Sequence, residues 1–129
     1  MGAPIMKLEP RRQSNDCAVW SLAMYLGKPY DEVWQVVQKI DRSKGRDGLH
    51  TATMRRVAKK LGHPLLKLPA TKITDDSYGV IAVTHPENAH AAVVRNGLVF
   101  DVDMTVWDLP TWLEGIGYTI ECLLTEEEP

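Results

Sequence analysis

The segment "HAAVVRNGLVFDVD", residues 90–103, constrains the fold more than any other part of the chain. It places the Asn-Gly pair at 96–97 between two runs of β-branched and apolar residues. This pair is typical of a type I′ turn, which requires positive φ at both central residues. We therefore predict an antiparallel hairpin in which Val94 lies opposite Val99.

The rest of the chain divides into a helical half and a strand half, with the change near His63. Apolar spacing predicts helices over 16–26, from about 31 to 40, and over 51–61. Besides the hairpin, apolar and β-branched runs predict strands over 65–68, 79–84 and 118–124, and Asp108 is positioned to cap a short helix over 109–115. Helices followed by an antiparallel sheet predict an α+β fold. We expect residues 1–129 to form a single domain.

Composition excludes several classes of partner and cofactor. The formal net charge is −2 and the basic residues are scattered, so we expect no binding to nucleic acid. No apolar stretch approaches the roughly 18 residues that span a bilayer, so we expect no membrane partner. Two cysteines do not form a secreted disulfide framework, which favours a reduced, cytoplasmic protein. We expect no cofactor and no metal, since the chain lacks a glycine-rich phosphate loop and a regular spacing of metal ligands.

Cys17 stands at the start of the first predicted helix, in "NDCAVWSLAMYLG". This helix is apolar on nearly every side, which is typical of a buried helix. A helix N-terminus lowers the pKa of a thiol, and an adjacent imidazolium lowers it further. Cys17 is therefore either a nucleophile or a small core residue. Cys122 lies in the alternating "YTIECLL", and we expect it to be a packed strand residue.

The predicted hairpin brings an imidazole and two carboxylates together. Continued pairing places Asp101 opposite Ala92 and Asp103 opposite His90, so all three polar side chains project from one side of the sheet. A carboxylate beside an imidazole fixes the tautomer of a catalytic base. The alternative is a half-exposed histidine with two solvent-facing aspartates. Upstream of the thiol, the amide of Gln13 is a candidate donor to an oxyanion.

These motifs resemble those of papain-like cysteine peptidases, nearest the bacteriocin-processing family that cleaves double-glycine leader peptides. The similar segments are "QSNDCAVWSLAMYLG", "PYDEV", "GLHTATMRRVAKKLGHPL" and "HAAVVRNGLVFDVD". The resemblance implies a papain-like fold, in which N-terminal helices pack on a small C-terminal antiparallel sheet. The first of these helices carries Cys17. It implies hydrolysis of a peptide amide, in a peptide or protein substrate, through an acyl-enzyme. Cys17 would be the nucleophile, His90 the general base and acid, Asp101 the residue that orients His90, and Gln13 the oxyanion donor.

Two alternatives remain open at this stage. The resemblance favours Asp101 as the partner of His90, whereas strand pairing favours Asp103. A deamidase or an acyltransferase would use the same catalytic residues. The second functional hypothesis is a catalytically inactive papain-like fold that serves as a protein-binding module. It is favoured by Ala18, which stands where the family has glycine, and by the short spacing between Gln13 and Cys17.

Overall fold

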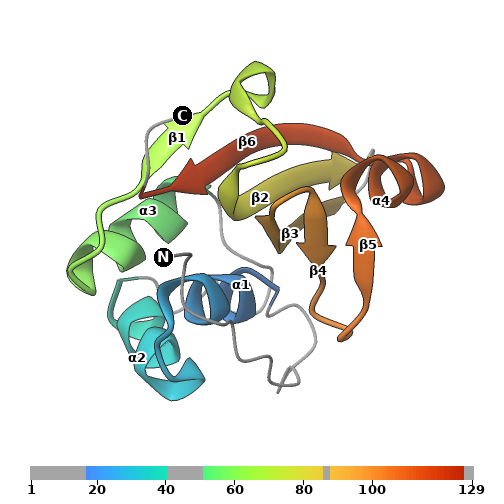
Figure 1. Cartoon of the computed structure of the whole chain (residues 1–129). Coiled ribbons are helices and arrows are strands. Elements are labelled where there is room, and N and C mark those ends of the chain that lie inside the picture. Colours follow the sequence, from blue (N-terminus) through green and yellow to red (C-terminus); the bar gives the residue numbers. More distant parts are fainter. Residues whose placement is uncertain (1–16, 41–50, 86–87, 127–129) are drawn as a thin grey trace.

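Three N-terminal helices pack against an antiparallel sheet, which confirms the predicted α+β architecture (Figure 1). The structure is a computed structural model, and it describes residues 17–40, 51–85 and 88–126. The helices are α1 (Cys17–Leu26), α2 (Tyr30–Ile40), α3 (Thr51–Lys60) and α4 (Leu109–Ile116), with a 3₁₀ turn η1 (Ala70–Lys72). The strands are β1 (Leu66–Leu68), β2 (Tyr78–His85), β3 (Asn88–Arg95), β4 (Leu98–Phe100), β5 (Val106–Asp108) and β6 (Thr119–Thr125).

The six strands form one sheet in the order β1-β6-β2-β3-β4-β5, and every neighbouring pair is antiparallel. The long strands β2, β3 and β6 occupy its centre. The short strand β5 was not predicted from the sequence. All three of its residues are exposed, so it lacks the alternation of apolar and polar residues by which a strand is recognised.

The hairpin between β3 and β4 has the predicted turn and part of the predicted register. Asn96 and Gly97 have φ of 52° and 79°, as a type I′ turn requires. Val94 lies opposite Val99, as predicted, but the ladder ends one pair later, at Phe100.

The predicted pairing of His90 with Asp103 is therefore wrong. Strand β4 stops at Phe100, and the chain turns back on itself at once. The Met104 amide donates to the Asp101 carbonyl at 2.9 Å, and the Asp101 amide donates to the Thr105 carbonyl at 3.0 Å. This turn carries Met104 at φ 69°, a left-handed conformation that cannot continue a strand.

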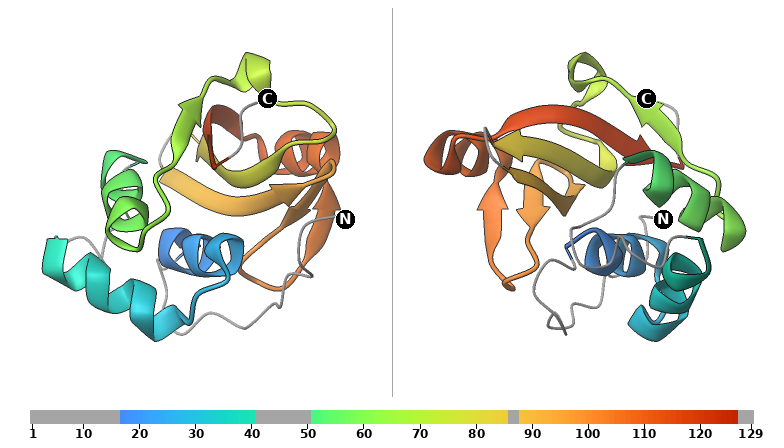
Figure 2. Two further views of the ribbon diagram at one scale, coloured as in Figure 1. Left: turned by 60° about the vertical axis from the view of Figure 1, so that its left-hand side comes forward. Right: turned by 180° about the vertical axis from the view of Figure 1, so that it is seen from behind.

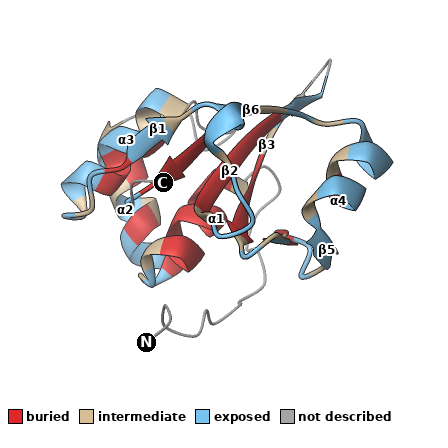
Figure 3. Cartoon of the chain, turned by 45° about the horizontal axis from the view of Figure 1, so that its top comes forward, coloured by how far each residue is buried: buried red, intermediate tan, exposed pale blue. Residues whose placement is uncertain are grey.

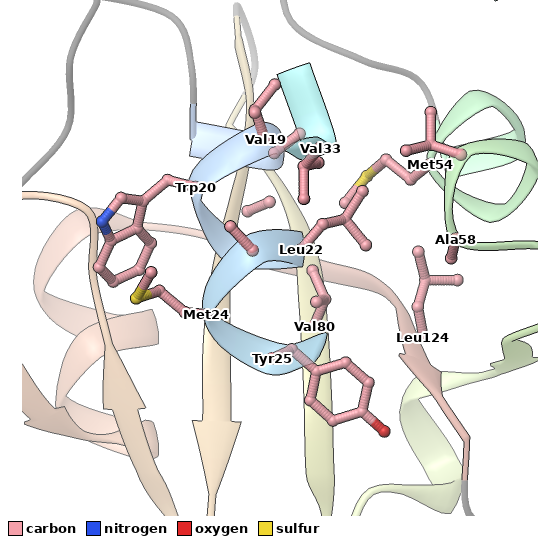
Figure 4. Close-up of a cluster of buried hydrophobic side chains, with 14 of the residues drawn as sticks. Val19, Trp20, Leu22, Met24, Tyr25, Val33, Met54, Ala58, Val80 and Leu124 are labelled. Carbon is pink, nitrogen blue, oxygen red and sulfur yellow. The ribbon is translucent and has the colours of Figure 1, made fainter. Parts of the chain in front are cut away.

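Helix α1 is buried along most of its length, as its all-round apolar sequence predicts (Figure 3). Its side chains form the centre of a core that also includes residues of α2, α3 and the sheet (Figure 4). Gly27, at φ 67°, ends the helix, and the Lys28 amide closes the last turn by donating to the Ala23 carbonyl at 3.0 Å. The helix packs mainly on β3. It is thereby fixed against the strand that carries His90.

The two faces of the sheet have different partners, as alternation along the central strands requires (Figure 2). One face packs on α1, α2 and α3 and includes Val80, Ala82, Ala91, Val93 and Leu124. The other face packs on α4 and includes Ile81, Val83, Ala92, Val94 and Leu123. Within the described ranges, no helix is both long enough and apolar enough to cross a membrane.

Candidate active site

Cys17 is the first residue of α1, and its side chain is half-buried at the edge of the core. Backbone N–H groups in the first turn of a helix have no acceptor within that helix. The sulfur of Cys17 therefore stands at the positive end of the helix dipole. The fold therefore gives Cys17 one of the two features that activate a thiol.

His90 is the third residue of β3, and its ring contacts the carboxylate of Asp101. Its Nε2 atom is 2.7 Å from Oδ1 of Asp101, and only 17% of its side chain is exposed. The Cys17 side chain is near enough to the same ring to raise its pKa. Because Nε2 faces Asp101, Nδ1 is the ring nitrogen left for the sulfur.

The protonated form of His90 is strongly favoured. Burial of the ring lowers its pKa, but the hydrogen bonds and charges of Asp101 and Cys17 outweigh that effect and raise the pKa to about 9. An imidazolium is therefore expected at neutral pH. This supplies the second feature that activates a thiol.

Asp101 lies directly after β4 and is buried, with 6% of its surface exposed. Its carboxylate has three hydrogen-bonding partners. Oδ1 faces His90 and accepts from the Val102 amide at 2.7 Å, while Oδ2 accepts from Nε1 of Trp112 at 3.0 Å. Burial raises the pKa of this carboxyl, but the bond and charge of His90, with the Trp112 and Val102 bonds, lower it overall. Asp101 is thus held as a carboxylate, and both of its oxygens are engaged in hydrogen bonds.

Asp103 has a different environment. Its exposed carboxylate accepts from the Thr105 amide at 3.1 Å and from the Thr105 hydroxyl, which in turn accepts from Trp107 Nε1 at 2.8 Å. The carboxylate bonded to His90 is that of Asp101. The geometry therefore favours Asp101, which the resemblance implied, over Asp103, which the strand pairing predicted.

Two aromatic rings surround His90. The Tyr118 ring is nearly parallel to the imidazole, with an interplanar angle of 8° and a centroid distance of 5.7 Å. Trp112 lies 6.2 Å from the imidazole and 4.9 Å from the Tyr118 ring. Tyr118 was not predicted, because nothing in the sequence indicates that the start of β6 lies near the start of β3.

The remaining predicted residues lie elsewhere or outside the described residues. Cys122 is 1% exposed opposite Ala82, and burial is the main cause of its raised pKa, so it is the packed strand residue that was expected. Gln13 lies outside the described residues. Across 17–40, 51–85 and 88–126, no group of three or more His, Cys, Asp or Glu is arranged to hold a metal ion.

No protein-family model matches the chain, and no curated protein matches it. The functional argument therefore depends on the Cys17, His90 and Asp101 geometry and on the quoted motifs.

Proposed function

We propose that the protein is a papain-like cysteine peptidase that hydrolyses a peptide amide in a peptide or protein substrate. The observation that carries the proposal is the 2.7 Å bond between His90 Nε2 and Asp101 Oδ1, and it is supported by the effect of Cys17 on the His90 pKa. A nucleophile, a base and a residue that orients the base are the parts that covalent acyl transfer requires. Their order along the chain is also the order in the similar peptidases.

In the proposed reaction, the Cys17 thiolate attacks the carbonyl carbon of the scissile amide. The negative charge passes to the carbonyl oxygen, where backbone N–H groups at the start of α1 are candidate donors, with Gln13 proposed as a second donor. The imidazolium of His90 gives its proton to the leaving amine as the C–N bond breaks. The acyl group then remains on Cys17 as a thioester. His90 then takes a proton from water, whose oxygen attacks the thioester, and the products are a carboxylic acid and the free enzyme.

The arrangement of elements supports the papain-like assignment. The nucleophile begins a buried helix, and the base lies on an antiparallel strand against which that helix packs. Ala18, the departure from the family's glycine, is only 3% exposed and belongs to the core cluster. Its methyl group is therefore buried, which supports an active site, because a buried methyl group does not crowd a bound substrate.

A protein-binding module is the second candidate function. It is favoured by the exposed apolar side chains of Leu98 and Val106, which the strand register places on the same face of β4 and β5. A group of apolar side chains exposed on neighbouring elements is typical of an interaction surface. The two candidates differ in the reactivity that they predict for Cys17.

Alkylation with iodoacetamide at pH 6 separates them. At this pH an ordinary thiol is almost fully protonated, so an activated Cys17 reacts faster than a free-cysteine peptide, and Cys122 reacts more slowly than either. The matched variants are Cys17→Ser, which removes the rapid reaction, and Cys122→Ser, which retains it. His90→Ala slows the reaction of Cys17. If Cys17 reacts no faster than the free-cysteine peptide, the peptidase proposal fails and the module is favoured.

Turnover is tested separately with a mixed peptide pool and detection of new termini by mass spectrometry. Cleavage by the unmodified protein and its loss in Cys17→Ser is the expected result. Cys17→Ser changes one half-buried atom, so the free energy of unfolding is expected to stay nearly constant. A large loss of stability would identify Cys17 as a core residue instead.

A further inference from the structure

We propose that Tyr118 is a positioning residue of this site, whose ring stacks on His90 and holds the imidazole in the orientation that bonds Asp101 through Nε2 and leaves Nδ1 for Cys17. The inference rests on the proposed function, because it assigns a role within the same site. It concerns a residue that neither the sequence motifs nor the resemblance identifies.

The contact between the two rings is close to parallel. An interplanar angle of 8° and a centroid distance of 5.7 Å describe an offset stack, the arrangement that aromatic rings prefer. The distance also lies within the range of about 6 Å over which an aromatic face attracts a cation. Trp112 contacts the Tyr118 ring at 4.9 Å with an interplanar angle of 47°, so the tyrosine is supported by a buried side chain.

The backbone around Tyr118 is fixed by the end of α4. Gly117 is left-handed at φ 84°, and its amide donates to the Leu113 carbonyl at 2.9 Å. The Tyr118 amide donates to the same carbonyl at 3.0 Å, and β6 begins at the next residue. The ring is therefore attached to a segment held by both a helix cap and a strand.

A hydrogen bond to Asp101 alone leaves one rotation of the imidazole unrestrained. It fixes the position of Nε2, and the backbone fixes Cβ, but the ring can still turn about the line through these two atoms and carry Nδ1 away from the sulfur. A parallel ring against the face of the imidazole opposes that rotation sterically. Its π-face also favours the imidazolium form, which attracts the Cys17 thiolate.

The experiment compares Tyr118→Leu with Tyr118→Phe. Leucine keeps an apolar side chain but removes the π-face, whereas phenylalanine keeps the ring and removes only the hydroxyl. NMR titration of the His90 ring protons should give a pKa about half a unit lower in Tyr118→Leu, and a value restored close to that of the unmodified protein in Tyr118→Phe. Alkylation of Cys17 at pH 6 should slow about threefold in the leucine variant if the freed ring faces the sulfur about a third of the time, and it should recover in the phenylalanine variant.

Three outcomes would overturn the inference or separate it from the proposed function. An unchanged His90 titration and Cys17 alkylation in Tyr118→Leu would overturn it, and so would a Tyr118→Phe variant as impaired as the leucine variant. If Tyr118→Leu does not fold, Tyr118→Met provides the same loss of the ring with a flexible side chain. An unreactive Cys17 in the unmodified protein, together with a shifted His90 titration in Tyr118→Leu, would overturn the proposed function and leave the stacking role supported.

Discussion

Asp101 and Asp103 are two residues apart and differ in almost every physical respect. Asp101 is buried, accepts from Trp112 and the Val102 amide, and contacts His90. Asp103 is exposed and accepts from Thr105 in its own turn. Strand alternation treats the two as equivalent, since residues i and i+2 share a face. The comparison shows that burial and the supply of donors, rather than alternation, select the partner of the imidazole.

The largest expected effect is that of Asp101→Asn. An amide has one acceptor oxygen, so it cannot replace both carboxylate oxygens, and its NH₂ group must face either Trp112 or His90. It also removes the charge that stabilises the imidazolium. We expect the rate of Cys17 alkylation at pH 6 to fall roughly ten- to a hundredfold, and peptide hydrolysis to fall at least as much.

The matched control for that variant is Asp103→Asn, which makes the same chemical change in the neighbouring turn. Equal losses in the two variants would contradict the difference in role. A near-normal rate in Asp101→Asn would show that the carboxylate charge is unimportant and that a neutral acceptor is sufficient to orient His90.

The pH dependence of hydrolysis and of stability sharpens the same comparison. Because the His90 pKa is raised to about 9, the acid form that protonates the leaving amine is lost above that pH, and hydrolysis should decline there.

The raised His90 pKa also contributes to the free energy of unfolding. This contribution is fully present below the unfolded pKa of 6.5 and is lost as pH rises toward about 9. The lowered Asp101 pKa contributes above the unfolded value of 3.8 and is lost on acidification.

Urea unfolding at a series of pH values measures this contribution directly. The free energy of unfolding should decline between pH 6.5 and about 9 in the unmodified protein and in Asp103→Asn. The decline should be smaller, and complete at lower pH, in Asp101→Asn. The same profile in all three proteins would contradict the ion pair between His90 and Asp101.

A smaller effect is expected for Trp112→Phe. This change removes the donor to Oδ2 of Asp101 but keeps an aromatic ring beside His90 and Tyr118. We expect a loss of about 1–3 kcal/mol in the free energy of unfolding, because a buried acceptor loses its partner. Alkylation of Cys17 should slow about tenfold or less, since the His90 contact remains.

The double variant Asp101→Asn, Trp112→Phe tests whether the two residues act together. Phenylalanine removes the N–H that opposes the asparagine NH₂, so the double variant should be less impaired than the sum of the single losses. Additive losses would show that Trp112 and Asp101 contribute independently.

The smallest effect is expected for Asp103→Asn itself. The asparagine oxygen can still accept from the Thr105 amide, so the turn should be retained. An exposed charge acts on the site only through screened electrostatics, and the rate of Cys17 alkylation should change by less than tenfold. Measurement at low and high salt is the check, since the remaining difference should shrink as ionic strength rises.

Much of the fold was predictable because its signals are local. The pattern of apolar residues within α1 and within α3 depends on a few adjacent residues, and so do the Asn-Gly turn and the Asp108 cap. The cap is observed as predicted, with the Asp108 carboxylate accepting from the Thr111 amide at 3.1 Å. The positions of Cys17 and His90 at the starts of their elements follow from the same signals.

The surroundings of the site depend on contacts that the sequence does not display. The turn at 101–105 ends the hairpin early, although "LVFDV" reads as a continuous strand. Tyr118 comes close to His90 only because β6 and β3 lie on either side of β2. Trp112 lies on α4, which packs on the face of the sheet opposite α1, and from there its Nε1 donates to Asp101. Each of these contacts requires the tertiary arrangement.

The separation of Cys17 and His90 along the chain has a consequence for the order of events during synthesis. Strands β2, β3 and β4 are sequential neighbours and can pair through local contacts, whereas closing α1 onto β3 joins distant segments. The helix that carries the thiol also leaves the ribosome before the histidine does. In a chain whose α1 has not yet packed on β3, the thiol is separated from the histidine, so the proposed reactivity of Cys17 depends on that long-range contact.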